Sequence, residues 1–341
     1  MFEKYLNNRF IILYFFPFIL GALTILSFEP FNLTIINLVI FPIFFYLVIY
    51  INKKSRSVYR KKPYKKNLFI YGLLFGFGFY ICGISWITNS LTFDENFKVL
   101  IPFALILIPL FLSLFLALTI LFVGPYLKFN FPSLFLFSAS IATCDYLRAK
   151  VLTGFPWNLW AYSTTWISEL LQVTNLIGLF SYNLLTVFVF TVPAIFFFKI
   201  SIIKKVTISF LLVFFVFSLY VFGNYEINKN KKVLDTTTEK IFVKIVSPSF
   251  DLEYGLDEKD IEKRFKKIIR YSDPDQNRKT LFVWPEGVFS GYSYNEILNF
   301  KELISNNFSK NHLIILGTNT LEPSSGNLYN SMLIVDNDFK I

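Results

Sequence analysis

Long uninterrupted apolar runs constrain this chain more than any other feature of its sequence. Crossing a hydrocarbon layer about 30 Å thick takes about 20 helical residues at about 1.5 Å each. Hydrophobic residues make up 54% of the 341 residues and charged residues only 16%, which excludes an ordinary soluble protein. The sequence therefore predicts a multi-span α-helical membrane domain of about seven helices. The seven runs are residues 9–28, 31–51, 67–87, 99–124, 132–150, 172–198 and 206–223.

The net charge of +10 belongs to this apolar part of the chain. Residues 229–341 carry 16 basic and 16 acidic residues, whereas residues 1–228 carry 17 basic and 7 acidic ones. A basic balance confined to a membrane domain gives no reason to expect a nucleic-acid partner. We therefore expect membrane lipids, not nucleic acid, around residues 1–228.

The basic residues also predict the orientation of the bundle, because Lys and Arg near helix ends stay on the cytoplasmic side. Eight of them lie between Lys53 and Lys66, and alternate loops add Lys4, Arg9, Lys128, Lys199, Lys204 and Lys205. The opposite loops hold only Lys98, Arg148 and Lys150. Since the first run is too long for a cleaved signal peptide, it should remain as a helix. We expect a cytoplasmic N-terminus and, after seven spans, a periplasmic C-terminal domain.

The composition changes after the last apolar run. Residues 224–240 are polar and unpatterned, which predicts a linker between a domain at 1–228 and one at 229–341. Four short apolar strands are then predicted, with two helices between the first three. Ser293 and Glu296 form a capping-box pattern at the start of the second helix. This order predicts an α/β sheet covered by helices. The domain would have about 113 residues and ends soon after a turn signal at Asp336–Asp338, so we expect it to be incomplete.

Glu286 is the most informative polar residue. It follows directly on the apolar segment 281–284, and α/β sheets expose functional side chains at the ends of their strands. A partly desolvated carboxylate at this place suits a general base. The alternative is an acid that caps a helix or stabilises a turn.

A second candidate lies in residues 153–163, after the fifth run. Gly154 and Pro156 should break the helix, and Phe155, Trp157, Trp160 and Tyr162 suit an interfacial aromatic belt. The functional alternative is a loop that lines a lipid entrance, with Phe155 and Trp157 as substrate-binding residues. Nearby, Asp145 and Arg148 stand one helical turn apart, so they could pair in a functional site or snorkel to the interface.

Metal and haem chemistry is not expected. The two cysteines, Cys82 and Cys144, fall inside apolar runs, and the single histidine, His312, opens an apolar run. We expect His312 to be structural and the chain to need no metal and no diffusible cofactor.

Several motifs, in this order, resemble those of the apolipoprotein N-acyltransferases. They are Gly21 to Phe31, Gly76 to Trp86, Leu147–Arg148 with Leu152 to Trp157, Trp284-Pro285-Glu286, and Tyr329-Asn330-Ser331. The resemblance covers essentially the whole chain, and it implies a nitrilase-like (carbon–nitrogen hydrolase) fold for residues 229–341. Ser247-Pro248-Ser249 departs from the family, which has Gln-(Gly/Pro)-Asn after this strand.

The resemblance implies a Glu-Lys-Cys triad in which Glu286 is the general base. A phospholipid donates its acyl group to the cysteine, and the N-terminal amine of a diacylglyceryl apolipoprotein accepts it, in the inner membrane of a bacterium. The family's lysine and cysteine would follow the Tyr329 motif, and this sequence ends before them. We therefore expect a C-terminally truncated acyltransferase that is inactive as it stands.

Two alternatives remain open at this point. One is a degenerate, non-catalytic remnant that binds lipid. The other is a seven-span transporter or receptor with an exported appendage, although charges within the spans, which transport favours, are scarce.

Overall fold

The computed structural model describes residues 10–58, 63–92, 95–152, 154–236, 241–250, 253, 256–322 and 324–341. The chain forms two compact units, Met1–Leu234 and Asp235–Ile341. Some residues of the predictions above lie outside the described ones. They are Lys4, Arg9, Arg60, Lys61, Lys62 and Thr153.

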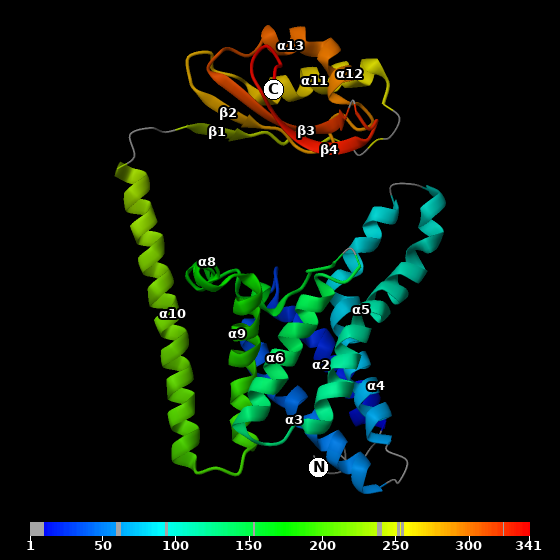
Figure 1. Ribbon diagram of the computed structural model, residues 1–341, viewed down its shortest axis with the longest axis vertical. Helices are drawn as coiled ribbons and strands as arrows, with labels where there is room; N and C mark the ends of the chain where they lie inside the picture. The colour runs from blue at the N-terminus through cyan, green and yellow to red at the C-terminus, as the bar shows by residue number, and fades with distance from the viewer. Residues whose placement is uncertain are drawn as a thin grey trace. The chain divides into compact units, whose positions relative to one another are not determined.

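The first unit is helical (Figure 1). Its main helices are η1 (Ile11–Phe15) with α2 (Phe16–Thr24), α3 (Asn37–Val58), α4 (Pro63–Ile84), α5 (Ile101–Val123), α6 (Phe131–Arg148), α9 (Leu179–Thr191) and α10 (Ile202–Thr236). Short helices connect them: η2 (Ile25–Ser27), η3 (Thr34–Ile36), η4 (Ser85–Thr92), η5 (Glu95–Leu100), η6 (Gly124–Tyr126), η7 (Trp160–Thr164), α7 (Ser168–Leu171), α8 (Thr174–Ile177) and η8 (Val192–Phe197).

Among the described residues, five helices are long and apolar enough to cross a membrane. They are Thr34–Arg56, Pro63–Thr92, Glu95–Tyr126, Leu179–Phe197 and Ile202–Thr236. The first predicted run forms the shorter helix Ile11–Ser27, and the fifth forms α6, which carries Asp145 and Arg148. The structure thus supports a multi-span bundle with about five candidate spans.

Two predicted boundaries were wrong. The run 172–198 is broken, because Gly178 adopts φ +76° between α8 and α9. The predicted linker 224–240 is helical as far as Thr236, because α10 continues beyond its apolar part. In this polar extension, Lys229 pairs with Glu226, one helical turn away, at 3.4 Å, which supports the helix. Residues 237–240 lie outside the described part of the chain.

Helix α4 packs against α2, α3 and α5. The close approach of α4 to α2 depends on two glycines. A Cβ atom on Gly21 would lie 2.0 Å from the Phe75 carbonyl oxygen, and a Cβ atom on Gly78 would lie 2.1 Å from the Phe18 carbonyl oxygen. Small residues at such crossings let two backbones approach closely in a membrane. The bundle core is rich in aromatic rings, and Phe44 stacks on Phe75 with centroids 4.0 Å apart.

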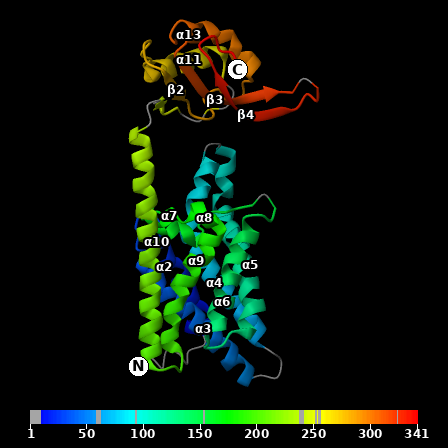
Figure 2. The same ribbon diagram turned by 60° about the vertical axis from the view of Figure 1, so that its left-hand side comes forward.

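The second unit is one four-stranded mixed sheet with helices (Figure 2). The strands β1 (Phe242–Ile245), β2 (Thr280–Val283), β3 (His312–Leu321) and β4 (Leu328–Val335) lie side by side in that order, and only β3 and β4 are antiparallel. The helical segments are α11 (Glu258–Ser272), α12 (Tyr294–Ile297), η9 (Leu298–Phe300) and α13 (Lys301–Ser305). The predicted β-α-β-α-β-β order is confirmed.

The predicted start of the second helix is confirmed, and the first helix also begins at a capping residue. Asp257 caps α11 by accepting a hydrogen bond from the Asp260 amide at 2.8 Å, and the capping box at Ser293 and Glu296 is present. The second helix is not continuous, because η9 separates α12 from α13. Both pieces still pack against the core, where Ile297 of α12 and Ile304 of α13 are fully buried.

In the described part of this unit, the helices cover one face of the sheet (Figure 1). Ile314 and Leu316 of β3 point to that face and are buried with the apolar side of α11. Strand alternation and the register place eight apolar residues on the opposite face. They are Val243, Ile245, Leu281, Val283, Leu313, Ile315, Met332 and Ile334. Ile245 is 78% exposed and Met332 73%, so nothing in the described part of this unit covers the bare face.

Candidate functional site

Glu286 follows β2 at the carboxyl end of the parallel strands. The chain is anchored there by Trp284, whose amide donates to the Ile315 carbonyl at 2.9 Å and whose buried indole donates to Ser272 at 3.0 Å. Gly287 then turns the chain with φ +77°. The Glu286 side chain is exposed, so the partial desolvation expected from the sequence is not present in this unit alone.

Asn330 of β4 orients this carboxylate. Its side-chain amide donates a hydrogen bond of 2.8 Å to Glu286 Oε1 across 44 residues of sequence. Gly317 of β3 leaves room for the contact, because a Cβ there would lie 3.4 Å from Glu286 Cγ. Alternation along β3 and β4 puts Gly317 and Asn330 on the bare face of the sheet. The motif 329–331 was noticed in the sequence, but no periodicity could have paired Asn330 with Glu286.

In the helical unit, a buried network fixes the loop after α6. Arg148 Nη2 donates to Asp145 Oδ1 at 3.1 Å, and Arg148 Nη1 donates to the carbonyls of Phe155 and, at 2.7 Å, Trp157. Asn183 of α9 donates to Asp145 Oδ2 at 2.9 Å. Arg148 and Asp145 are almost fully buried. The predicted pairing of Asp145 with Arg148 is therefore confirmed, whereas snorkelling to the interface is contradicted by the burial of both side chains.

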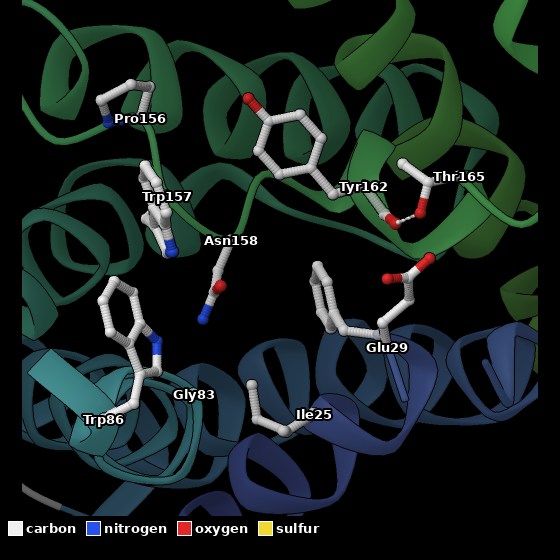
Figure 3. Close-up of a pocket in the computed structure, with 10 residues that line it drawn as sticks. Ile25, Glu29, Gly83, Trp86, Pro156, Trp157, Asn158, Tyr162 and Thr165 are labelled. Atoms are coloured by element: carbon white, nitrogen blue, oxygen red, sulfur yellow. Dashed lines mark hydrogen bonds between the residues drawn. The ribbon is translucent and has the colours of Figure 1, made fainter. Parts of the chain in front are cut away.

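This loop lines a cavity of about 470 Å³. Trp86 and Trp157 stand on one side of it, with ring centroids 5.6 Å apart, and Glu29 stands on the other (Figure 3). The amide of Asn158 lies between them, and its Nδ2 is buried without a hydrogen-bond partner. Ile25 and Phe28 add apolar surface. An aromatic and aliphatic cavity with a few polar groups is typical of a small-molecule or lipid site.

The four aromatic residues predicted as an interfacial belt separate into different environments. Trp157 is 49% exposed and lines the cavity, whereas Phe155 does not line it and contributes its carbonyl to Arg148. The belt prediction is wrong for Trp160. Its ring is buried in the core, stacked on Phe79 at 4.5 Å and edge-on to Phe41 at 4.8 Å.

His312 is structural, as expected. It is 1% exposed, its Nδ1 accepts from the Ser309 amide at 3.0 Å, and its Nε2 lies 2.9 Å from the Asp275 carbonyl. Because Nδ1 is an acceptor, the proton belongs on Nε2, which donates to that carbonyl. Both cysteines lie in the helical unit, Cys82 exposed and Cys144 buried.

The chain is similar to known proteins over most of its length. A family model described as "Apolipoprotein N-acyltransferase N-terminal domain" matches residues 20–192. Proteins named apolipoprotein N-acyltransferase from Allorhizobium ampelinum and Brucella melitensis are 26% and 27% identical to it, over 81% and 79% of this chain. One from Rhodopseudomonas palustris is 32% identical over 51% of the chain. The chain spans about half the length of the first two relatives, 52% and 50%.

Proposed function

This chain belongs to the apolipoprotein N-acyltransferase family, and from that premise we propose that it serves phospholipid-dependent N-acylation of apolipoproteins. It contributes a lipid-binding membrane unit and the general base, Glu286. The observation that carries this proposal is the placement of Glu286 after β2, oriented by Asn330 on an apolar sheet face. The names of the relatives agree with it.

In the proposed reaction, Glu286 removes the proton of a cysteine thiol. The thiolate attacks the ester carbonyl of a phospholipid, the ester C–O bond breaks, and a thioester and a lysophospholipid form after the proton passes to the leaving oxygen. The amine of a diacylglyceryl-cysteine then attacks the thioester, and the C–S bond breaks as the amide forms. Glu286 accepts the amine proton and returns it to the thiolate.

We propose a thiol other than those of Cys82 and Cys144, because the resemblance implies a cysteine that follows the Tyr329 motif. A cysteine and an oxyanion-stabilising lysine from outside these 341 residues complete the proposed triad, in agreement with relatives about twice as long. We expect the chain by itself to give no turnover. N-acylation by the purified 341-residue chain would contradict the proposed triad.

A second layer over the bare sheet face would complete a nitrilase-like sandwich in residues 229–341. Eight apolar side chains on that face favour this arrangement, because a large exposed apolar patch marks a surface that packs against another part of the protein or a partner. The same layer would exclude water from Glu286 and Asn330, which lie toward that face. The desolvation expected from the sequence then depends on the second layer.

The proposed orientation in the bacterial inner membrane places residues 1–228 across the bilayer, the N-terminus in the cytoplasm and residues 229–341 in the periplasm. Its support is the gathering of basic residues at one end of the helical unit. The ring centroid of Phe129, next to Lys128, lies 5.1 Å from Lys53 Nζ and 6.4 Å from the ring centroid of Phe198, next to Lys199. Three basic loops therefore meet at one end, which the positive-inside rule assigns to the cytoplasm.

The cavity beside Trp157 is the proposed lipid-binding part of the membrane unit. Trp86, Phe28 and Ile25 provide surface for an acyl chain, and Asn158 and Glu29 provide polar groups near the end of the bundle. Trp157 is the proposed substrate-binding residue, because its side chain lines this cavity. Phe155 acts indirectly, by holding the loop through Arg148.

The experiment is an N-acylation assay on residues 1–341 fused to the remaining C-terminal segment of the Brucella melitensis relative. Mass spectrometry follows acyl transfer from phospholipid to a diacylglyceryl lipopeptide. We expect activity from the fusion and a loss of about 10²- to 10⁴-fold with Glu286→Gln, the usual contribution of a general base. Glu302→Gln, at an exposed glutamate of α13, is the matched control. A folded fusion without activity, or full activity of Glu286→Gln, would contradict the proposal.

A further inference from the structure

A second hollow, of about 400 Å³, lies at the basic end of the helical unit. Tyr46, Tyr50, Lys53 and Lys54 of α3 and Phe129 before α6 line it. The cavity beside Trp157 lies near the other end of α3, because Thr34, just before that helix, donates to the Ser163 carbonyl. Tyr50 is 13 residues beyond Asn37, or about 20 Å along the helix, so the two sites are separate.

Aromatic rings hold the cations of this hollow in place. Lys53 Nζ lies 5.1 Å from the centroid of the Phe129 ring, and Lys54 Nζ lies 5.4 Å from that of Tyr50 and donates to its hydroxyl at 3.1 Å. Tyr46 stacks against Tyr50 with centroids 6.2 Å apart. Such cation–π contacts restrain long side chains whose ammonium groups would otherwise be dispersed.

Cations gather at this end of α3. Residues 37–66 and 122–134 contain no Asp or Glu, and Arg56 adds a third cation in the last turn of α3, over the Tyr64 ring at 4.5 Å. Two ammonium groups beside a hollow with tyrosine hydroxyls suit a phosphate diester. The surroundings suit a lipid, because Phe197, 41% exposed, lies 4.8 Å from Tyr46 and continues the apolar surface.

We propose that this hollow binds the headgroup of an anionic phospholipid, with the phosphate between Lys53 and Lys54 and an acyl chain along Tyr46 and Phe197. The lipid is a structural one, distinct from any acyl donor, and it fixes this end of α3 at the anionic surface of the cytoplasmic leaflet. The inference uses no catalytic residue and stands without the proposed acyl transfer.

Native mass spectrometry of the full 341-residue chain, released from detergent micelles, tests this site. Phosphatidylglycerol is titrated against phosphatidylcholine with the same acyl chains, and inorganic phosphate is a third arm. We expect retention of phosphatidylglycerol only. Lys53→Gln/Lys54→Gln should weaken that binding by about fivefold per side chain, or about thirtyfold for the pair.

The matched control is Lys65→Gln/Lys66→Gln, which removes two exposed charges near the same end of the unit but does not line the hollow. We expect it to change the affinity less than threefold, and the conservative Lys53→Arg/Lys54→Arg to keep most of the binding. An equal loss of phosphatidylglycerol affinity in the two double Gln variants would mean that diffuse charge attraction, not this hollow, binds the lipid, and it would overturn the proposal. Equal retention of phosphatidylcholine, or displacement of the lipid by inorganic phosphate at equal concentration, would likewise overturn the proposal.

Discussion

Replacing Arg148 by Met should open the helical unit around α6. The change leaves the Asp145 carboxylate buried with only the Asn183 amide, and it removes the donor to the Phe155 and Trp157 carbonyls. Breaking a buried ion pair from one side costs about 3–5 kcal/mol. At about 1.4 kcal/mol per tenfold change, the opening equilibrium should rise roughly 100- to 4,000-fold.

Cys144 offers a direct assay of this opening. Cys144 is 3% exposed and is adjacent to Asp145 in the sequence, so labelling by a maleimide in a Cys82→Ser background measures how often α6 opens. Lys150→Met is the matched control, because it also replaces one cation by methionine at the end of α6 but at an exposed position. We expect it to leave the labelling rate within about threefold of the parent rate.

Asp145→Asn together with Arg148→Met should recover part of the lost stability. The double variant removes the unpaired charge and leaves only the two loop carbonyls without their donor. We expect Cys144 to label at least tenfold more slowly than in Arg148→Met alone. A rise below tenfold in Arg148→Met, or equal rates in the single and double variants, would refute the buried-pair reasoning.

Three further predictions concern other parts of the chain. Hydrogen bonds from the Ser293 hydroxyl and amide lower the pKa of Glu296, so the Glu296 carboxylate should stabilise α12 fully above pH 4.5, the usual pKa of glutamate. This stabilisation should be lost as the pH falls through the lowered pKa of the folded state. Amide hydrogen exchange of α12 should show the change, and Glu296→Gln should abolish the pH dependence. Gly78→Leu should prevent the α2–α4 contact and lower the thermal midpoint by several degrees, more than Ala139→Leu on the exposed side of α6. In the fusion protein, Asn330→Ala should slow acyl transfer about 10- to 100-fold, because the hydrogen bond to Glu286 is lost, and should leave the stability unchanged. If Asn330 served folding alone, the variant would lower the stability and the activity together.

Much of the fold follows from local pattern. The apolar runs predicted the main helices, and the capping-box pattern at Ser293 and Glu296 predicted where α12 begins. The breaks were harder, because Gly178 stops a helix inside a continuous apolar run. The polar sequence 224–236 lacks the apolar pattern of a packed helix, yet it continues α10.

The candidate site was only partly visible in the sequence. Glu286 could be chosen because it follows a strand, and Trp157 because it stands near a helix break. Asn330 and Gly317 act through the register of β3 and β4, which sequence spacing alone does not determine. Trp160 was misassigned, since an aromatic residue beside a loop can pack inward as readily as it can face the interface.

The most direct test of Glu286 as the general base is the formation of the acyl-enzyme. The fusion protein is incubated with a phospholipid carrying a radioactive acyl chain and no acceptor, and the label that hydroxylamine releases is counted over time. We expect a thioester with the parent protein and a rate at least 100-fold lower with Glu286→Gln. Thioester formation at the parent rate in Glu286→Gln would contradict this role for Glu286.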